Sequence, residues 1–144
     1  MIYTTLNKIR EHTPCKSGWE KLLTHLGKTQ ADDDPLPLLT ILDSNGLDNC
    51  LWCLRTVPEH DRKWRLFAVW CTRKIEYLMT DQRSKDALNV VERFANGLAT
   101  QKELTAAGAA ARAAARAAAG AAARAAARDA AGAAQEQELR RILS

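Results

Sequence analysis

The side chains of this chain that are best suited to chemistry are four cysteines, of which Cys50 and Cys53 form a Cys-x-x-Cys pair. In a suitable fold such a pair binds zinc or cycles between thiol and disulfide, and His12 with Cys15 could complete a tetrahedral site. No strand is predicted before the pair, and the chain has no second Cys-x-x-Cys. We therefore interpret Cys50 and Cys53 as small core residues one helical turn apart, and we predict no metal ion and no cofactor.

The remaining polar residues show no recognisable catalytic arrangement. His25 and His60 are isolated from nucleophiles, and the chain carries no phosphate-binding loop and no Gly-x-Ser-x-Gly motif. The acidic run at residues 32–34 lacks the glycine and the distal glutamate of a calcium loop, so we interpret it as a solvated turn. We predict that the protein is not an enzyme and has no catalytic residues.

Residues 105–134 are almost entirely alanine, and the exceptions are regularly spaced. Alanine has the highest helix propensity, so this segment is predicted to be helical. Because each residue turns the helix by about 100°, the arginines gather on one side and leave a methyl-rich side opposite. This arginine arc consists of Arg112, Arg116, Arg124 and Arg128. We predict that its guanidinium groups bind acidic groups of a partner protein.

The methyl-rich side of the same helix is predicted to be a contact surface, because small side chains let two helix backbones approach closely. A projecting surface of this kind favours a second copy of the chain, so we predict a homodimer. Apolar residues near the C-terminus would then enter the partner's core. The predicted dimer seam contains Ala109, Ala113, Asp129, Leu139, Ile142 and Leu143.

Nucleic acid is an alternative partner for the basic residues. Phosphates could follow the arginine arc, and a second basic cluster surrounds Trp64 and Trp70, as on surfaces that bind single strands. These tryptophans share helix faces with leucine and phenylalanine, however, which favours a place in the core, and the net charge is only +4. The second cluster contains Arg62, Lys63, Arg65, Arg73 and Lys74. We therefore place protein binding ahead of nucleic acid binding.

Helical periodicity and helix stop residues predict an all-α fold. A small helical bundle is expected over residues 1–100 and a long Ala-rich helix over residues 101–144. Helices of the bundle are predicted at 2–11, 17–26, 38–45, 47–57, 61–79 and 84–96. The helix at 61–79 is apolar on two sides, so we expect it at the centre of the bundle.

Local motifs set the predicted helix ends. Ser17 with Glu20 and Thr100 with Glu103 match the capping box that begins a helix. The glycines at 108, 120 and 132 have no proline or loop cluster beside them, so we predict one continuous helix from 101 to 143, about 65 Å long. No apolar run could cross a bilayer and no signal peptide is recognisable, so we expect a cytoplasmic protein with no membrane partner.

The first hundred residues resemble small proteins of bacteriophage and prophage genomes that are described as immunity proteins. The resemblance lies in Gly18-Trp19-Glu20-Lys21-Leu22-Leu23, Leu26-Gly27-Lys28, the stretch from Pro35 to Asp48, Arg65-Leu66-Phe67 and Trp70-Cys71. An Ala/Arg tail often follows in that group, as it does here. The resemblance implies a helical, non-enzymatic protein of the host cell cytoplasm. Such a protein would act by binding another protein, a toxin or a host defence such as a CRISPR complex.

Overall fold

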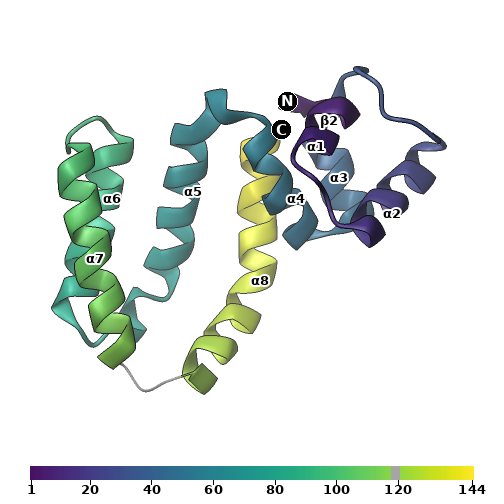
Figure 1. The fold of residues 1–144 in the computed structure, drawn as a ribbon. Helices are drawn as coiled ribbons and strands as arrows, with labels where there is room; N and C mark the ends of the chain where they lie inside the picture. The colour runs from purple at the N-terminus through teal and green to yellow at the C-terminus, as the bar shows by residue number, and fades with distance from the viewer. Residues whose placement is uncertain (118–120) are drawn as a thin grey trace. The chain divides into compact units, whose positions relative to one another are not determined.

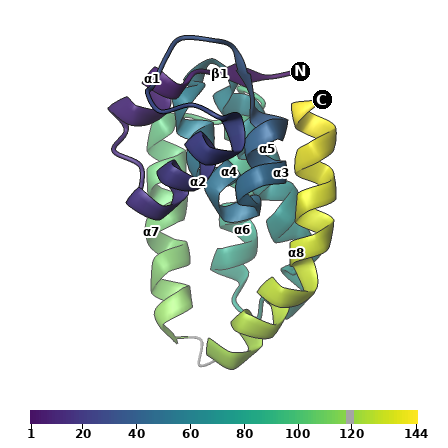
Figure 2. The same cartoon turned by 90° about the vertical axis from the view of Figure 1, so that its right-hand side faces the viewer.

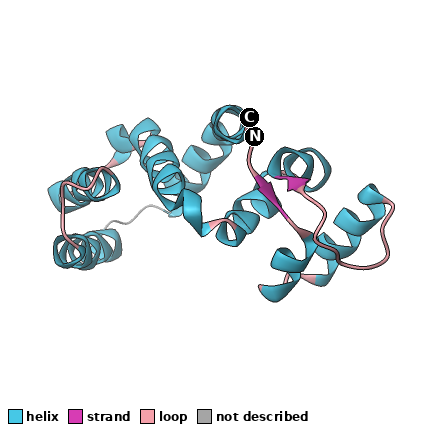
Figure 3. Ribbon diagram, turned by 90° about the horizontal axis from the view of Figure 1, so that it is seen from above, coloured by secondary structure: helices cyan, strands magenta, loops and turns pink. Residues whose placement is uncertain are grey.

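The computed structural model describes the backbone of residues 1–117 and 121–144 and the side chains of residues 1–110 and 132–144 (Figure 1). The described residues are mostly helical, which confirms the predicted all-α class, and a single short pair of strands accompanies the helices (Figure 3). The α-helices are α1 (Leu6–Glu11), α2 (Lys16–Leu26), α3 (Leu38–Asn45), α4 (Leu47–Cys53), α5 (Asp61–Lys74), α6 (Gln82–Ala95), α7 (Gln101–Ala117) and α8 (Ala121–Leu143). The 3₁₀ helices are η1 (Leu54–Thr56), η2 (Pro58–His60) and η3 (Glu76–Leu78), and the strands are β1 (Tyr3–Thr4) and β2 (Leu36–Pro37).

The chain forms two compact units, and their boundaries do not follow the predicted division at residue 100. The first unit contains Met1–Asp61 together with the C-terminal residues Leu139–Ser144. The second unit contains Arg62–Glu138. The last residues of the chain therefore belong to the same unit as the first ones.

The two ends of the chain lie side by side in the first unit (Figure 2). The Ile2 amide donates to the Leu143 carbonyl at 3.0 Å, and the Ile2 carbonyl accepts from the Leu38 amide at 3.0 Å. Thr4 then pairs with Leu36 in the antiparallel sheet. The predicted helix at 2–11 is therefore wrong in its first part, because residues distant in sequence hold residues 2–4 extended. Thr5 caps α1, which begins only at Leu6.

An apolar core fills the first unit and is contributed by almost every element. Helices α3 and α4 form a helical hairpin, and Gly46 between them has φ 85°, a backbone angle that residues with a side chain rarely adopt. The fully buried side chains include Leu6, Ile9, Leu38, Ile41, Cys50, Val57, Leu139 and Leu143. Leucines from the last turn of α8 thus complete a core that is built mainly from residues before position 60.

The second unit is built on α5, α6, α7 and most of α8. On α5 the buried residues are Phe67 and Val69, whereas Tyr77 and Leu78, which lie within the predicted helix at 61–79, are exposed in η3. Helix α5 ends at Lys74, earlier than the predicted end at Met79. Helix α7 packs along α6 (Figure 1), after a turn that contains Gly97 with φ 74°. The predicted central helix is thus only partly buried.

The capping box at the start of α7 is confirmed. The Thr100 amide donates to Glu103 Oε2 at 2.7 Å, and the Glu103 amide donates to Thr100 Oγ1 at 3.2 Å. The other predicted box is wrong, because α2 begins at Lys16 and Ser17 lies inside it.

The Ala-rich segment is described as two helices rather than one. Helix α7 runs through Gly108 and α8 runs through Gly132, so neither glycine ends a helix. Residues 118–120, which include Gly120, lie outside the described residues, and a continuous helix from 101 to 143 is not confirmed. In the described part of the chain, no helix combines the length and the hydropathy that a membrane span requires.

Candidate functional site

A pocket of about 180 Å³ lies in the first unit, between α2 and the α3–α4 hairpin. Small-molecule sites usually occupy about 300–1,000 Å³, so this pocket is of a size for a single side chain rather than for a cofactor. Its mouth reaches solvent, because Cys15 and Asp48 on its rim are exposed. The lining residues are Ile9, Pro14, Cys15, Gly18, Trp19, Leu22, Ile41, Asn45, Asp48, Asn49, Trp52 and Cys53.

The lining of the pocket is apolar at its floor and mixed at its rim. Ile9, Leu22 and Ile41 are buried and belong to the core of the first unit. Trp19 and Trp52 are half-buried, so part of each indole remains accessible. An apolar group that entered the pocket would therefore leave water for a mainly apolar surrounding.

Gly18 allows α2 to approach the α3–α4 hairpin closely. The Asn45 side-chain amide donates to the Gly18 carbonyl at 2.8 Å, and the Asn49 side-chain amide donates to the Asn45 carbonyl at 3.2 Å. A Cβ atom at position 18 would lie 2.5 Å from Asn49 Oδ1 and 3.0 Å from Cys15 Sγ. Because position 18 has no side chain, α2 can pack directly against Asn45 and Asn49 on one side of the pocket.

Cys15 precedes the first residue of α2 and carries the most accessible thiol. Its pKa is lowered, first by the Gly18 backbone amide and then by the Ser17 hydroxyl, because both donate to the thiolate. A group of this kind at the pocket rim is a convenient site for chemical labelling.

Cys50 and Cys53, which we interpreted as core residues, are buried. Burial raises the pKa of each thiol to about 12, and Cys50 Sγ lies 3.5 Å from the Leu38 carbonyl oxygen. Within the described residues, no three histidine, cysteine or acidic side chains come together in a way that could hold a metal ion. The zinc arrangement with His12 and Cys15 is therefore not formed in the described part of the chain.

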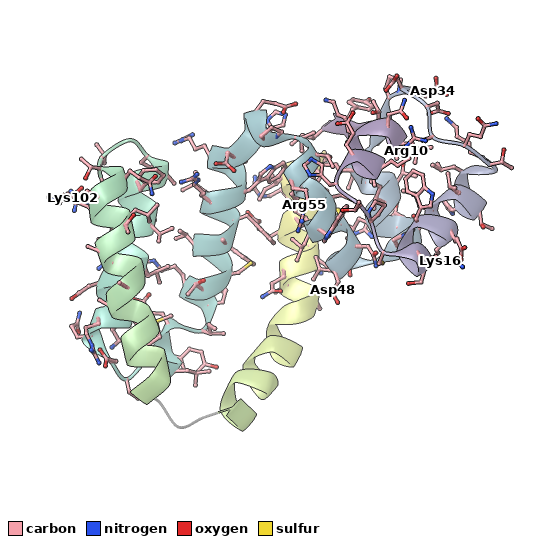
Figure 4. The ribbon with its side chains drawn as sticks, viewed as in Figure 1. Arg10, Lys16, Asp34, Asp48, Arg55 and Lys102 are labelled. Carbon is pink, nitrogen blue, oxygen red and sulfur yellow. The ribbon has the colours of Figure 1, made fainter. Side chains whose placement is uncertain are left out.

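One carboxylate dominates the charge of the pocket. Asp48 is the only aspartate, glutamate, lysine or arginine among the lining residues, and the structure records no ion pair for it with any described residue. Arg55 lies beyond the other end of α4 (Figure 4), with its guanidinium carbon 4.4 Å from the centroid of Trp52 and its Nε donating to the Trp52 carbonyl at 2.8 Å. The rim beside Asp48 therefore has negative character.

The basic cluster of α5 is largely engaged within the second unit. Arg62 donates to the Ala95 carbonyl and to Asn96 at the end of α6, at 3.1 and 2.8 Å. Arg73 pairs with Glu76 at 3.1 Å and with Glu92 at 2.6 Å. Guanidinium groups held in this way secure the helices of the unit, and they are poorly placed to follow a phosphate backbone.

The predicted dimer seam differs from the structure at two of its residues. Leu139 and Leu143 are fully buried in the core of the first unit of their own chain, so they are not available to a partner's core while that unit is folded. Ile142 is half-buried and Ala109 is exposed on α7. The side chains of the arginine arc (Arg112, Arg116, Arg124 and Arg128) and of Ala113 and Asp129 lie outside the described residues.

Comparison with family models, curated proteins and solved structures finds no match for this chain.

Proposed function

We propose that this chain is a non-enzymatic protein-binding inhibitor or immunity factor that holds its partner through the pocket between α2, α3 and α4. The observation that carries the proposal is the pocket itself, a side-chain-sized cavity with an apolar floor and an accessible mouth. Binding energy at protein interfaces is concentrated in a few side chains that fill such cavities. The resemblance to phage immunity proteins supports a toxin or a host defence protein as the partner.

The charge of the pocket favours a protein over a nucleic acid. A phosphate group would meet the Asp48 carboxylate at the rim and would be repelled by it. Nucleic acid binding would depend instead on the arginine arc, whose side chains lie outside the described residues. Protein binding is thus the function that the described geometry supports best.

The proposal is tested by blocking the pocket in the full-length protein. Immobilised protein would be labelled at Cys15 with N-phenylmaleimide, which places an aromatic ring at the pocket mouth, and then exposed to host cytoplasmic extract. The matched control is Cys15→Ser treated with the same reagent, which leaves the pocket open. We expect a protein captured by the wild type and by Cys15→Ser to be lost from the labelled wild type. Equal capture by the labelled protein, with unchanged circular dichroism, would reject the pocket as the binding site.

The arginine arc is tested separately. Replacing Arg112, Arg116, Arg124 and Arg128 with glutamine is expected to leave the helical content unchanged and to reduce capture of the same partner, and undiminished capture would reject their role.

Salt dependence identifies the class of partner. Affinity for a phosphate backbone falls by orders of magnitude between about 50 and 200 mM salt, whereas an interface with an apolar centre loses much less.

A further inference from the structure

The pocket combines an apolar floor with a single acidic group on its rim, and these two features together specify what fits it. The floor is formed by Ile9, Leu22 and Ile41, whose side chains make no hydrogen bonds. A group that inserts there must therefore be apolar. A volume of about 180 Å³ holds one aliphatic or aromatic side chain. The first requirement on a ligand is therefore a single apolar anchor.

The second requirement comes from the charges around the mouth. Asp48 is exposed and has no ion-pair partner among the described residues. Asp48 lies in the first turn of α4, whose partial positive charge is smaller than the full charge of the carboxylate, so the negative character of the rim comes from Asp48 alone. A cation next to the anchor would be attracted to this part of the rim.

Five cations stand within two residues of the lining residues in the sequence, and none of them lines the pocket: Lys8, Arg10, Lys16, Lys21 and Arg55. Lys16 follows Cys15 but pairs with Glu20 at 3.9 Å and extends into solvent, and it does not line the pocket. Arg55 lies over Trp52, beyond the opposite end of α4 from Asp48 (Figure 4). The rim therefore keeps a net negative character where Asp48 projects.

We propose that the pocket recognises a protein segment in which an apolar side chain stands next to a lysine or an arginine. The apolar side chain fills the floor, and the neighbouring cation pairs with Asp48. This inference rests on the proposed function, because it specifies the partner segment for the same pocket. An acidic residue next to the anchor would be repelled, so the pocket discriminates between segments of equal hydrophobicity by their charge.

Short capped peptides test the two requirements separately. Full-length ¹⁵N-labelled protein would be titrated with N-acetylated, C-amidated tetrapeptides that contain Leu-Lys, Leu-Glu or Ala-Lys between two glycines. The indole N–H signals of Trp19 and Trp52 report binding, after assignment with Trp19→Phe and Trp52→Phe. We expect the Leu-Lys peptide to bind about fivefold more tightly than Leu-Glu, as for an exposed ion pair. It should bind at least about tenfold more tightly than Ala-Lys, which leaves the floor unfilled.

A matched pair of variants assigns the charge preference to one residue. Asp48→Asn should bring the affinities for Leu-Lys and Leu-Glu to within about twofold of each other. Asp33→Asn, which removes an equal charge from the exposed loop at residues 32–34, should leave the fivefold preference intact. Thermal unfolding of both variants checks that the first unit remains folded.

Each result bears on either the inference or the proposed function. If Leu-Lys and Leu-Glu bind equally, or if Asp48→Asn keeps the preference, the charge requirement is wrong, although blocking at Cys15 can still abolish partner capture. If no peptide shifts the indole signals at its solubility limit, the anchor requirement is wrong as well. If the peptides show the expected preference but blocking leaves capture unchanged, the pocket specificity stands and the proposed function fails.

Discussion

The four cysteines illustrate how local environment decides the chemistry of one residue type. Cys50 and Cys53 are buried and have pKa values of about 12, so they remain protonated and inaccessible near neutral pH. Cys71 is half-buried, and burial raises its pKa. Cys15 is exposed at the start of α2, and backbone and hydroxyl donors lower its pKa. Thiol reactivity depends on thiolate population and access, and both favour Cys15.

We therefore predict that a maleimide labels Cys15 selectively. At neutral pH, one molar equivalent of the maleimide should attach a single label to the protein, and peptide mapping should locate it at Cys15. The Cys15→Ser variant should remain almost unlabelled. Because only the thiolate reacts, the rate should rise with pH and level off at a lower pH than the rate for an ordinary cysteine peptide. Preferential labelling at Cys71, or a rate profile shifted to higher pH, would contradict the environment described for Cys15.

At the scale of elements, short-range motifs could be predicted from the sequence, whereas features made by distant residues could not. The capping box at Thr100 was predicted correctly because both its residues lie in one turn. The same pattern failed at Ser17, because α2 begins at Lys16 with Cys15 as its cap, and Gly18 inside the helix contacts the α3–α4 hairpin. The pocket was missed for the same reason, since its walls come from separate helices and periodicity does not show which helices meet.

Two glycines in helices provide a matched test of how α2 meets the hairpin. Glycine to alanine in an unobstructed helix stabilises it by about 1 kcal/mol. Gly132→Ala in α8 should do so, because an added Cβ would have no neighbour within 4 Å. Gly18→Ala should instead destabilise the protein, by up to about 2 kcal/mol, since its Cβ would lie 2.5 Å from Asn49 Oδ1 and force that side chain to move. Urea unfolding measures both, and equal stabilisation by the two variants would show that α2 does not approach α4 as described.

At the scale of the whole molecule, the main difference from the sequence prediction is the place of the C-terminal residues. We predicted that Leu139 and Leu143 enter a partner's core, because the projecting methyl-rich side of the Ala-rich helix favours a second copy of the chain. The structure places both in the first unit, where the Ile2 amide donates to the Leu143 carbonyl and Arg140 pairs with Asp43 at 2.6 Å. The apolar character of these two residues favours a place in a core, but it does not distinguish a core of the same chain from that of a second copy.

This difference leads to a prediction about stability and its dependence on concentration. Leu139→Ala should destabilise the first unit by about 2–5 kcal/mol, the usual cost of removing a fully buried leucine side chain. Hydrogen exchange of the α3 amides should then accelerate, although α3 is about a hundred residues away in sequence. Gln137→Ala, an exposed change on the same helix, should leave that exchange unaltered.

The midpoint of thermal unfolding separates the two possible roles of Leu139. If Leu139 lies in the core of its own chain, replacing it lowers the midpoint by the same amount at every protein concentration. A leucine at a dimer seam would instead make the midpoint depend on concentration, and its replacement would weaken association measured by light scattering. We expect the first behaviour. A decrease in the midpoint that depends on concentration, with unchanged hydrogen exchange in α3, would show that Leu139 lies at a dimer seam. The C-terminal residues would then not belong to the first unit.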